Sequence, residues 1–329
     1  MNLSTTYMGL RLPHPLIAGA SPLANDMDTV RKLEDAGAAA IVMHSLFEEQ
    51  LVMEQMASLR DLDAHEDAHS EAQSYFPEAN RFSLGPEQYL ERLRRVKDAV
   101  NIPVFGSLNG YTPGGWLDFA KQMQDAGADA LELNVYHITT DPDQSADEVE
   151  NQTVEMVQAL KAQVSIPLAI KLSPFYSALA HFARRLGHAG ADGILIFNRF
   201  YEPDIDPEEL TVTRHLKLSD SSTLLMRLRW LAILSEKVDA SLAVTGGVHT
   251  GLDAIKAVMA GAHAVQMVSA LLQHGPEHLR LVRFEMDKWL EEHEYESLEQ
   301  AQGSMNLVRC PEPQEYGRAN YIDILQSWD

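Results

Sequence analysis

A group of hydrogen-bonding side chains follows an apolar run that begins at residue 131. The stretch LELNVYHITT, residues 131–140, opens like a buried strand and then presents Asn134, His137 and Thr139 in close succession. An apolar strand gains nothing from such an ending unless a polar ligand lies against it. Imidazole exchanges a proton near neutral pH, so His137 is a candidate general base. The alternative, which the sequence leaves open, is a loop histidine that hydrogen-bonds a ligand or the backbone.

A lysine interrupts a second apolar run, AIKLSPF, at residues 169–175. Burying a lysine is costly unless its ammonium group meets an anion or loses its proton. Lys171 could therefore contact an electron-rich ring, or form a Schiff base with a carbonyl substrate. A lysine whose ammonium group extends to the rim of the site is the simpler alternative.

Two adjacent glycines mark a third candidate site. Gly246 and Gly247 end a predicted strand near 241–247, and Ser269 ends the next one, near 264–270. Paired glycines let backbone N–H groups approach a ligand closely, which suits a phosphate. A tight turn without a ligand is the alternative. We expect a phosphate site, because phosphate groups in parallel barrels are bound after the last two strands.

The segment HEDAH, residues 65–69, matches the H-E-x-x-H pattern of zinc metalloproteases. Its flanks, in RDLDAHEDAHSEAQS, are polar on every face, whereas a catalytic zinc helix must pack an apolar side against the protein. We interpret this segment as a solvated part of a lid and expect no metal site.

A recurring pattern places these residues on a common frame. The segments DAGAAAIV, DAGADALEL, HAGADGILI and MAGAHAVQM each combine a helix end, a glycine cap and a buried strand. Eight strands are predicted in all, separated by amphipathic helices, near 14–20, 39–45, 103–109, 130–135, 167–173, 193–199, 241–247 and 264–270.

This alternation predicts an α/β fold of the TIM (β/α)8 barrel type, with an open doubly wound sheet as the alternative. The barrel is favoured because no GxGxxG follows the first strand, and because polar residues gather after many strands. The connections 46–86 and 200–222, after strands two and six, are long enough to wall a pocket. We predict one domain, 1–329, with 294–329 as an extension packed outside the barrel.

Composition narrows the classes of function. Lys and Arg total 26 against 48 for Asp and Glu, and the net charge of −22 argues against nucleic-acid and membrane partners. The single cysteine, Cys310, excludes an internal disulfide and an iron–sulfur cluster held by this chain, so redox chemistry would need a bound organic cofactor. The N-terminal stretch has no features of a signal peptide, and no segment approaches a membrane span. We predict a cytoplasmic protein.

The barrel pattern, the glycine pair and Lys171 together resemble the dihydroorotate dehydrogenase family of FMN-dependent barrels. The resemblance covers nearly the whole chain and is most specific in TGGVHTGLDAIKAVMAGAHAVQMVSALLQHGP, where the family carries a similar run of GGV, DA, AGA, VQ and GP. It implies an FMN-dependent oxidoreductase of the soluble type that acts on a CH–CH group. The implied reaction converts dihydroorotate to orotate in pyrimidine biosynthesis, or acts on a related dihydropyrimidine.

The resemblance also assigns residues. It implies that Lys171 faces the N1/O2 edge of the flavin and that Gly246, Gly247 and Ser269 hold its phosphate. The full set of implied cofactor contacts is Ala20, Ser21, His44, Ser45, Asn109, Asn134, Lys171, Asn198, Gly246, Gly247 and Ser269. The implied substrate contacts are Asn134, Thr139, Asn198 and Arg199.

Departures from the family pattern fall on the substrate side. His137 stands where the family carries its catalytic Cys or Ser, and the Pro and Asn that follow are replaced by Ile138 and Thr139. His44 replaces a lysine, and Arg199 replaces a serine. Because lost hydrogen-bond partners strongly change substrate discrimination, the resemblance implies the flavin more firmly than dihydroorotate itself.

Two other functions stay open at this point. One is a flavin-free, phosphate-binding lyase or isomerase in which Lys171 forms a Schiff base. The other is a non-catalytic flavin-binding subunit of a larger complex. The redox hypothesis requires an external electron acceptor or electron-transfer partner, such as fumarate, NAD, a quinone or ferredoxin. The resemblance further implies a homodimer.

Overall fold

The computed structural model describes residues 1–51, 85–112, 114, 117–318 and 320–327. Its main sheet is parallel and closes on itself, because the second strand of the ring pairs with both the first and the third. Around the ring the order is β4-β3-β13-β12-β9-β8-β7-β6, and β5 extends the second position beside β6. The predicted (β/α)8 barrel is confirmed.

The strands are slightly shorter than the sequence suggested. They are β3 (Leu16–Ala18), β4 (Ile41–Val42), β5 (Leu46–Phe47), β6 (Val104–Asn109), β7 (Ala130–Asn134), β8 (Leu168–Leu172), β9 (Gly193–Ile196), β12 (Ser241–Thr245) and β13 (Ala264–Met267). Predicted ends at residues 199 and 270 overran the true ends by three residues each. Phe197 and Ala270 lie beyond the last paired residues of β9 and β13 but are still buried. The apolar sequence pattern therefore continues past the end of each strand.

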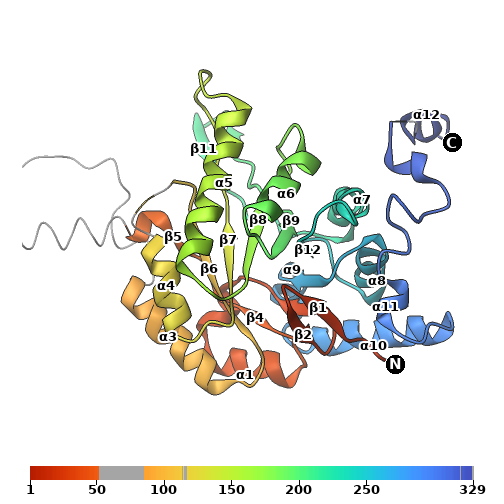
Figure 1. Cartoon of the computed structure of the whole chain (residues 1–329), viewed down its shortest axis with the longest axis horizontal. Helices are drawn as coiled ribbons and strands as arrows, with labels where there is room; N and C mark the ends of the chain where they lie inside the picture. Colours follow the sequence, from red (N-terminus) through yellow and green to blue (C-terminus); the bar gives the residue numbers. More distant parts are fainter. Residues whose placement is uncertain (52–84, 113, 115–116, 319, 328–329) are drawn as a thin grey trace, which may run out of the picture.

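Amphipathic helices surround the barrel (Figure 1). They are α1 (Met27–Asp35), α3 (Pro86–Ala99), α4 (Leu117–Asp125), α5 (Ala146–Gln163), α6 (Leu179–His188), α7 (Leu224–Leu234), α8 (Gly251–Ala260) and α10 (His278–Glu292), with a short α9 (Ser269–His274) after β13. Capping boxes start two of them: Ser145 with Glu148 at α5, and Thr250 with Asp253 at α8.

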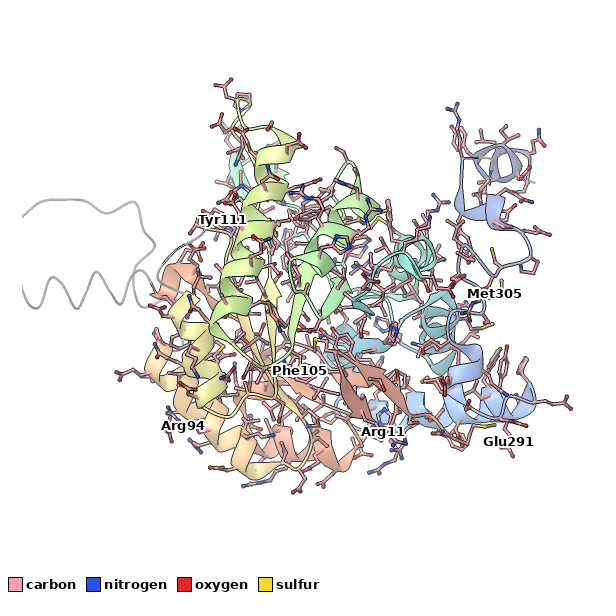
Figure 2. All side chains as sticks on the ribbon, in the orientation of Figure 1. Arg11, Arg94, Phe105, Tyr111, Glu291 and Met305 are labelled. Atoms are coloured by element: carbon pink, nitrogen blue, oxygen red, sulfur yellow. The ribbon has the colours of Figure 1, made fainter. Side chains whose placement is uncertain are left out.

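The barrel interior is closed at its amino end. A hairpin of β1 (Thr5–Tyr7) and β2 (Leu10–Leu12) inserts Tyr7 and Met8 there, and the Met8 N–H donates to Ser241 Oγ at 3.1 Å. These side chains join a small apolar cluster inside the barrel that includes Leu195 and Phe105, the latter labelled in Figure 2. Only the carboxyl end is therefore left for polar side chains and a ligand.

The structure describes the long connection 200–222 in full and the connection 46–86 only in part. Residues 52–84, which include HEDAH, lie outside the described residues. The second connection contains a hairpin of β10 (Asp204–Asp206) and β11 (Thr211–Thr213), which rises with the start of α5 at the top of Figure 1. The carboxyl ends of the strands open toward that side.

The C-terminal segment is anchored on the barrel exterior at its beginning. After α11 (Leu298–Ala301), the N–H groups of Gly303 and Met305 donate to the carbonyls of Val258 and Met259 on α8. The short α12 (Asn320–Gln326) stands away from the barrel in Figure 1, and its side chains from Tyr321 onward are exposed. Within the described ranges no helix combines the length and the apolar character needed to cross a membrane.

Candidate functional site

A buried ion pair occupies the centre of the barrel mouth. Lys171 on β8 donates from Nζ to Glu132 Oε1 on β7 at 3.3 Å, and Gln266 on β13 donates to the other oxygen of the same carboxylate. All three side chains are buried. They point inward because alternate residues of a barrel strand face the interior. The interior therefore holds one fixed positive charge and one fixed negative charge above an apolar layer.

Three asparagines border this pair at the carboxyl edge. Asn109, Asn134 and Lys171 are ladder neighbours on β6, β7 and β8. Asn198, two residues after β9, donates from its amide to Asn134 Oδ1 at 2.8 Å. The structure thus brings Lys171 together with the predicted asparagines. Their amides offer both donors and acceptors to a heterocyclic ring.

The predicted residues after β3 and β4 continue this edge on the other side of β6. Ser45 shares a hydrogen bond with Ser107 Oγ at 2.8 Å, and His44 contacts Asn25 at 3.4 Å. Burial lowers the pKa of His44, and the charge of Arg92 lowers it further. The site is thus arranged to hold a neutral imidazole at this position. Ala20 and Ser21 follow β3 directly.

The glycine pair forms a polar cradle with two serines. Gly246 and Gly247 both have positive φ, at 84° and 85°. The Gly247 N–H donates to Ser219 Oγ at 3.2 Å, and the Ser219 N–H donates to Ser269 Oγ at 3.1 Å. Glycine is required at position 247 by packing as well, because a Cβ there would lie 2.4 Å from the Leu224 nitrogen of α7. The sequence suggested that the glycines let a ligand approach the backbone closely. In the structure, the group that approaches Gly247 closely is the backbone of α7.

His137 lies against an aromatic wall. Its ring stacks on Tyr111, with centroids 4.5 Å apart and planes 19° apart, and its buried Nε2 has no hydrogen-bond partner among the described residues. His137 and Thr139 line a cavity of about 380 Å³, as does Val135, the residue after β7. Lys171 is not among the described residues that line it. The structure therefore places His137, and not Lys171, in the described wall of this cavity.

The remaining walls of this cavity come from the loops after β8 and β9 and from α5. Phe175 and Tyr176 follow β8, Phe200 follows β9, and Glu150 with Thr153 lies on α5. Burial raises the pKa of Tyr176 to about 12, and the charge of Glu150 contributes. The described lining thus mixes aromatic side chains with a larger number of polar ones, which could orient a small molecule.

The last two predicted substrate residues lie at the rim. Thr139 is exposed, and Arg199 is half-buried with its guanidinium 5.9 Å from the centre of the Tyr201 ring. Arg199 makes no ion pair in the part of the chain that the structure describes. In the same ranges, no group of three His, Cys, Asp or Glu side chains is placed to hold a metal ion.

Comparison with known proteins decides the family. The family model described as dihydroorotate dehydrogenase matches residues 82–290, which is more than half of the chain. The chain belongs to the dihydroorotate dehydrogenase family. The matched residues contain every strand from β6 to β13. They therefore include the lysine cluster, which is Lys171 with Glu132 and Gln266, and the glycine cradle, which is the glycine pair with its two serines.

Relatives of known name align with most of this chain. The catalytic subunit of dihydroorotate dehydrogenase B (NAD(+)) from Thermoplasma volcanium is 24% identical, with 92% of this chain and 98% of the relative aligned. The corresponding subunit from Methanocaldococcus jannaschii is 25% identical over 88% of this chain and 94% of its own length. Subunit PreA of the NAD-dependent dihydropyrimidine dehydrogenase from Escherichia coli K12 is 22% identical over 93% of this chain and 77% of its own length.

Four residues of this site were not predicted from the sequence. Glu132 and Gln266 carried a usable signal, since each is the only strongly polar residue before the end of an apolar strand. Such a residue inside a barrel strand must find a partner there. Ser219 and Arg227 carried none, because a serine in a polar loop and an arginine in a helix are usual on a protein surface. Tertiary packing alone brings them to the cradle.

Proposed function

We propose that this protein is an FMN-dependent dehydrogenase that oxidises the CH–CH bond of a dihydropyrimidine, either dihydroorotate or a closely related ring. Membership of a family of dehydrogenases supports an oxidoreductase. The observation that carries the proposal is the Lys171 and Glu132 pair buried at the barrel mouth beside Asn109, Asn134 and Asn198. A cation held in this position suits a ring that accumulates negative charge when it is reduced.

The residues present fit FMN at both of its ends. The N–H of Gly247 and the hydroxyls of Ser219 and Ser269 form a cradle at the end of β12, where a phosphate would replace the hydrogen bonds they now make to one another. Lys171, Asn109 and Asn134 lie on the neighbouring strands β6, β7 and β8, which β9 separates from β12 in the ring. When bound, FMN supplies the hydride acceptor.

The chain's own residues divide the remaining work. Lys171 would stabilise negative charge at the N1/O2 edge of the ring, and Glu132 holds it in place from below. Asn134 and Asn198, already joined to each other, would bind amide and carbonyl groups of the flavin and substrate. Thr139 and Arg199 at the rim would contact the substrate from its open side.

We assign proton removal to His137. Its ring is oriented by the stack on Tyr111, and its Nε2 atom has no hydrogen-bond partner within the part of the chain that the structure describes. A histidine at this position can act without a further base, whereas the hydroxyl of a serine there would need help to lose its proton. The alternative of a Schiff-base lyase is disfavoured, because Lys171 Nζ is already engaged by Glu132 inside the barrel and is not directed at a carbonyl substrate.

The proposal extends to the protein's surroundings. The relatives are named as catalytic or other subunits of NAD-linked enzymes, which supports reoxidation through an electron-transfer partner. We also propose a single FMN-binding domain over 1–329 with 294–329 as its extension, a homodimer, and a cytoplasmic location.

Two measurements test this function. The purified protein should show the yellow colour and two visible absorption bands of an oxidised flavin, and heat should release FMN. Anaerobic mixing with dihydroorotate, or separately with dihydrouracil, should bleach those bands. Bleaching by one ring identifies the substrate. A flavin that neither ring reduces, although dithionite does, would support the non-catalytic subunit instead, and a colourless protein that binds no flavin would contradict the proposal.

A further inference from the structure

A buried arginine stands behind the glycine cradle. Arg227 on α7 is 4% exposed. Its guanidinium donates to three backbone carbonyls, those of Thr245, Thr223 and Phe197, the last two at 2.8 and 3.1 Å. These carbonyls come from the end of β12, the start of α7 and the residue after β9. Arg227 therefore ties together three of the elements that surround the cradle.

The charge of this arginine is not balanced by the described residues. Its hydrogen-bond acceptors are all neutral carbonyls, and it takes part in none of the ion pairs found in the described ranges. The charged group that acts on it most is another arginine, Arg199, and burial together with this repulsion lowers the pKa of Arg227 to about 10. A buried charge without a counter-ion is costly, and the chain as a whole carries a net charge of −22. Two neighbouring cations in so acidic a protein indicate an anionic ligand.

The position of the guanidinium identifies where that anion binds. A Cβ on Gly246 would lie 3.0 Å from one guanidinium nitrogen and 3.3 Å from Cζ, so Arg227 packs directly against the first glycine of the pair. Arg227 also holds the Thr245 carbonyl. In a trans peptide the C=O and the following N–H point in opposite directions. Arg227 therefore turns the Gly246 N–H away from itself, toward the side on which a ligand would lie.

We propose that Arg227 is the positioning residue and buried counter-charge for the phosphate of the flavin, acting through the Thr245–Gly246 peptide from behind the cradle. This inference rests on the proposed function, since it names the charge that retains FMN at that same site. It predicts that the protein discriminates between FMN and riboflavin, which share the ring and differ in the phosphate, mainly through this one side chain.

Flavin titrations of the apoprotein test the inference. Arg227→Gln should weaken FMN binding by about ten- to a hundredfold, the usual effect of removing one charged partner. Riboflavin binding should change much less, because it has no phosphate. Arg229→Gln is the matched control: it removes the same charge from an exposed position on the same helix and should leave both affinities unchanged. Equal losses for FMN and riboflavin in Arg227→Gln would overturn the inference.

A second measurement keeps the inference testable if Arg227→Gln does not fold. The buried Nε resonance of Arg227 can be followed by NMR in wild-type protein labelled with ¹⁵N-arginine, and assigned by its disappearance in Arg227→Lys. It should shift when FMN binds and stay in place when riboflavin binds. The same response to both flavins would refute the role of Arg227. Wild-type protein that binds neither flavin would instead refute the FMN proposal itself, so the two failures are distinguishable.

Discussion

Lys171 Nζ lies 3.3 Å from Glu132 Oε1 inside the barrel, where the two side chains are 8% and 1% exposed. The Gln266 side-chain amide donates a hydrogen bond to the other carboxylate oxygen of Glu132. In such a setting neither charge has water to replace its partner, so each fixes the position of the other. The pair therefore sets the electrostatic field under any ring that covers the mouth.

Glu132→Gln should raise the midpoint potential of the bound flavin. The substitution removes a negative charge and leaves Lys171 unbalanced, which stabilises the reduced, negatively charged ring. We expect a rise of about 30 mV or more, which corresponds to about 1.4 kcal/mol for a two-electron couple. Spectroelectrochemical titration measures it. Glu150→Gln also breaks a largely buried ion pair, with Arg185 on α6, and should not change the potential. An unchanged potential in Glu132→Gln would show that the ring does not lie over Lys171.

His137→Ala should retain FMN and slow its reduction by substrate. Loss of a general base typically lowers a rate by about a hundred- to ten-thousandfold. Stopped-flow bleaching under anaerobic conditions gives the rate, and the ratio of flavin to protein absorbance gives the occupancy. His181→Ala removes an exposed imidazole from α6 and serves as the control. Reduction at the wild-type rate in His137→Ala would assign the histidine to binding or structure.

Gly247→Ala should destabilise the fold with or without flavin. Position 247 combines a φ of +85° with a Cβ that would lie 2.4 Å from the Leu224 nitrogen, so either α7 or the cradle must move. We expect a loss of about 3 kcal/mol or more in the free energy of unfolding. Gly9→Ala is a matched control, because Gly9 has a φ of +78° and open space around it. There the loss should be about 1 kcal/mol. Equal losses in urea unfolding would remove the packing argument.

His14 should make the protein sensitive to mild acid. Burial, and then the charge of Arg283, lowers the pKa of His14 to about 4, and its Nδ1 accepts the Leu16 N–H at 3.2 Å. The unfolded chain takes up a proton near pH 6.5 and the folded chain does not, so the stabilisation is complete above about pH 6.5 and is lost as the pH falls toward about 4. The total contribution is roughly 3 kcal/mol.

Urea unfolding of wild type and His14→Gln at about pH 7.5 and about pH 5 checks this sign. The glutamine carbonyl can still accept the Leu16 N–H and does not titrate. The variant should therefore lose about 2 kcal/mol less than wild type between the two pH values. Parallel losses in both proteins would mean that other groups govern the acid response.

Local sequence determined the barrel because each unit carries its own instructions. The segment DAGADALEL places a glycine with positive φ at residue 127 and an apolar run after it, and β7 follows over Ala130–Asn134. Helix caps, glycine turns and apolar periodicity act over a few residues, so they can be read without knowledge of the fold. The same logic located Lys171, Asn109 and Asn134 at strand ends, and Asn198 just beyond one.

Tertiary structure decided which of these residues act together. Glu132 is 39 residues from Lys171 and 134 from Gln266, yet one carboxylate binds both, because closure of the sheet directs side chains of β7, β8 and β13 into the same interior. Arg227 reaches the glycine cradle only through the packing of α7 against β12. The stack on Tyr111 holds His137 in the wall of the cavity formed by α5 and the loops after β7, β8 and β9. The sequence by itself determined the elements and the chemistry available at their ends. Only closure of the barrel determined the partners of each charge, since electrostatic and packing contacts depend on distance in space and not along the chain.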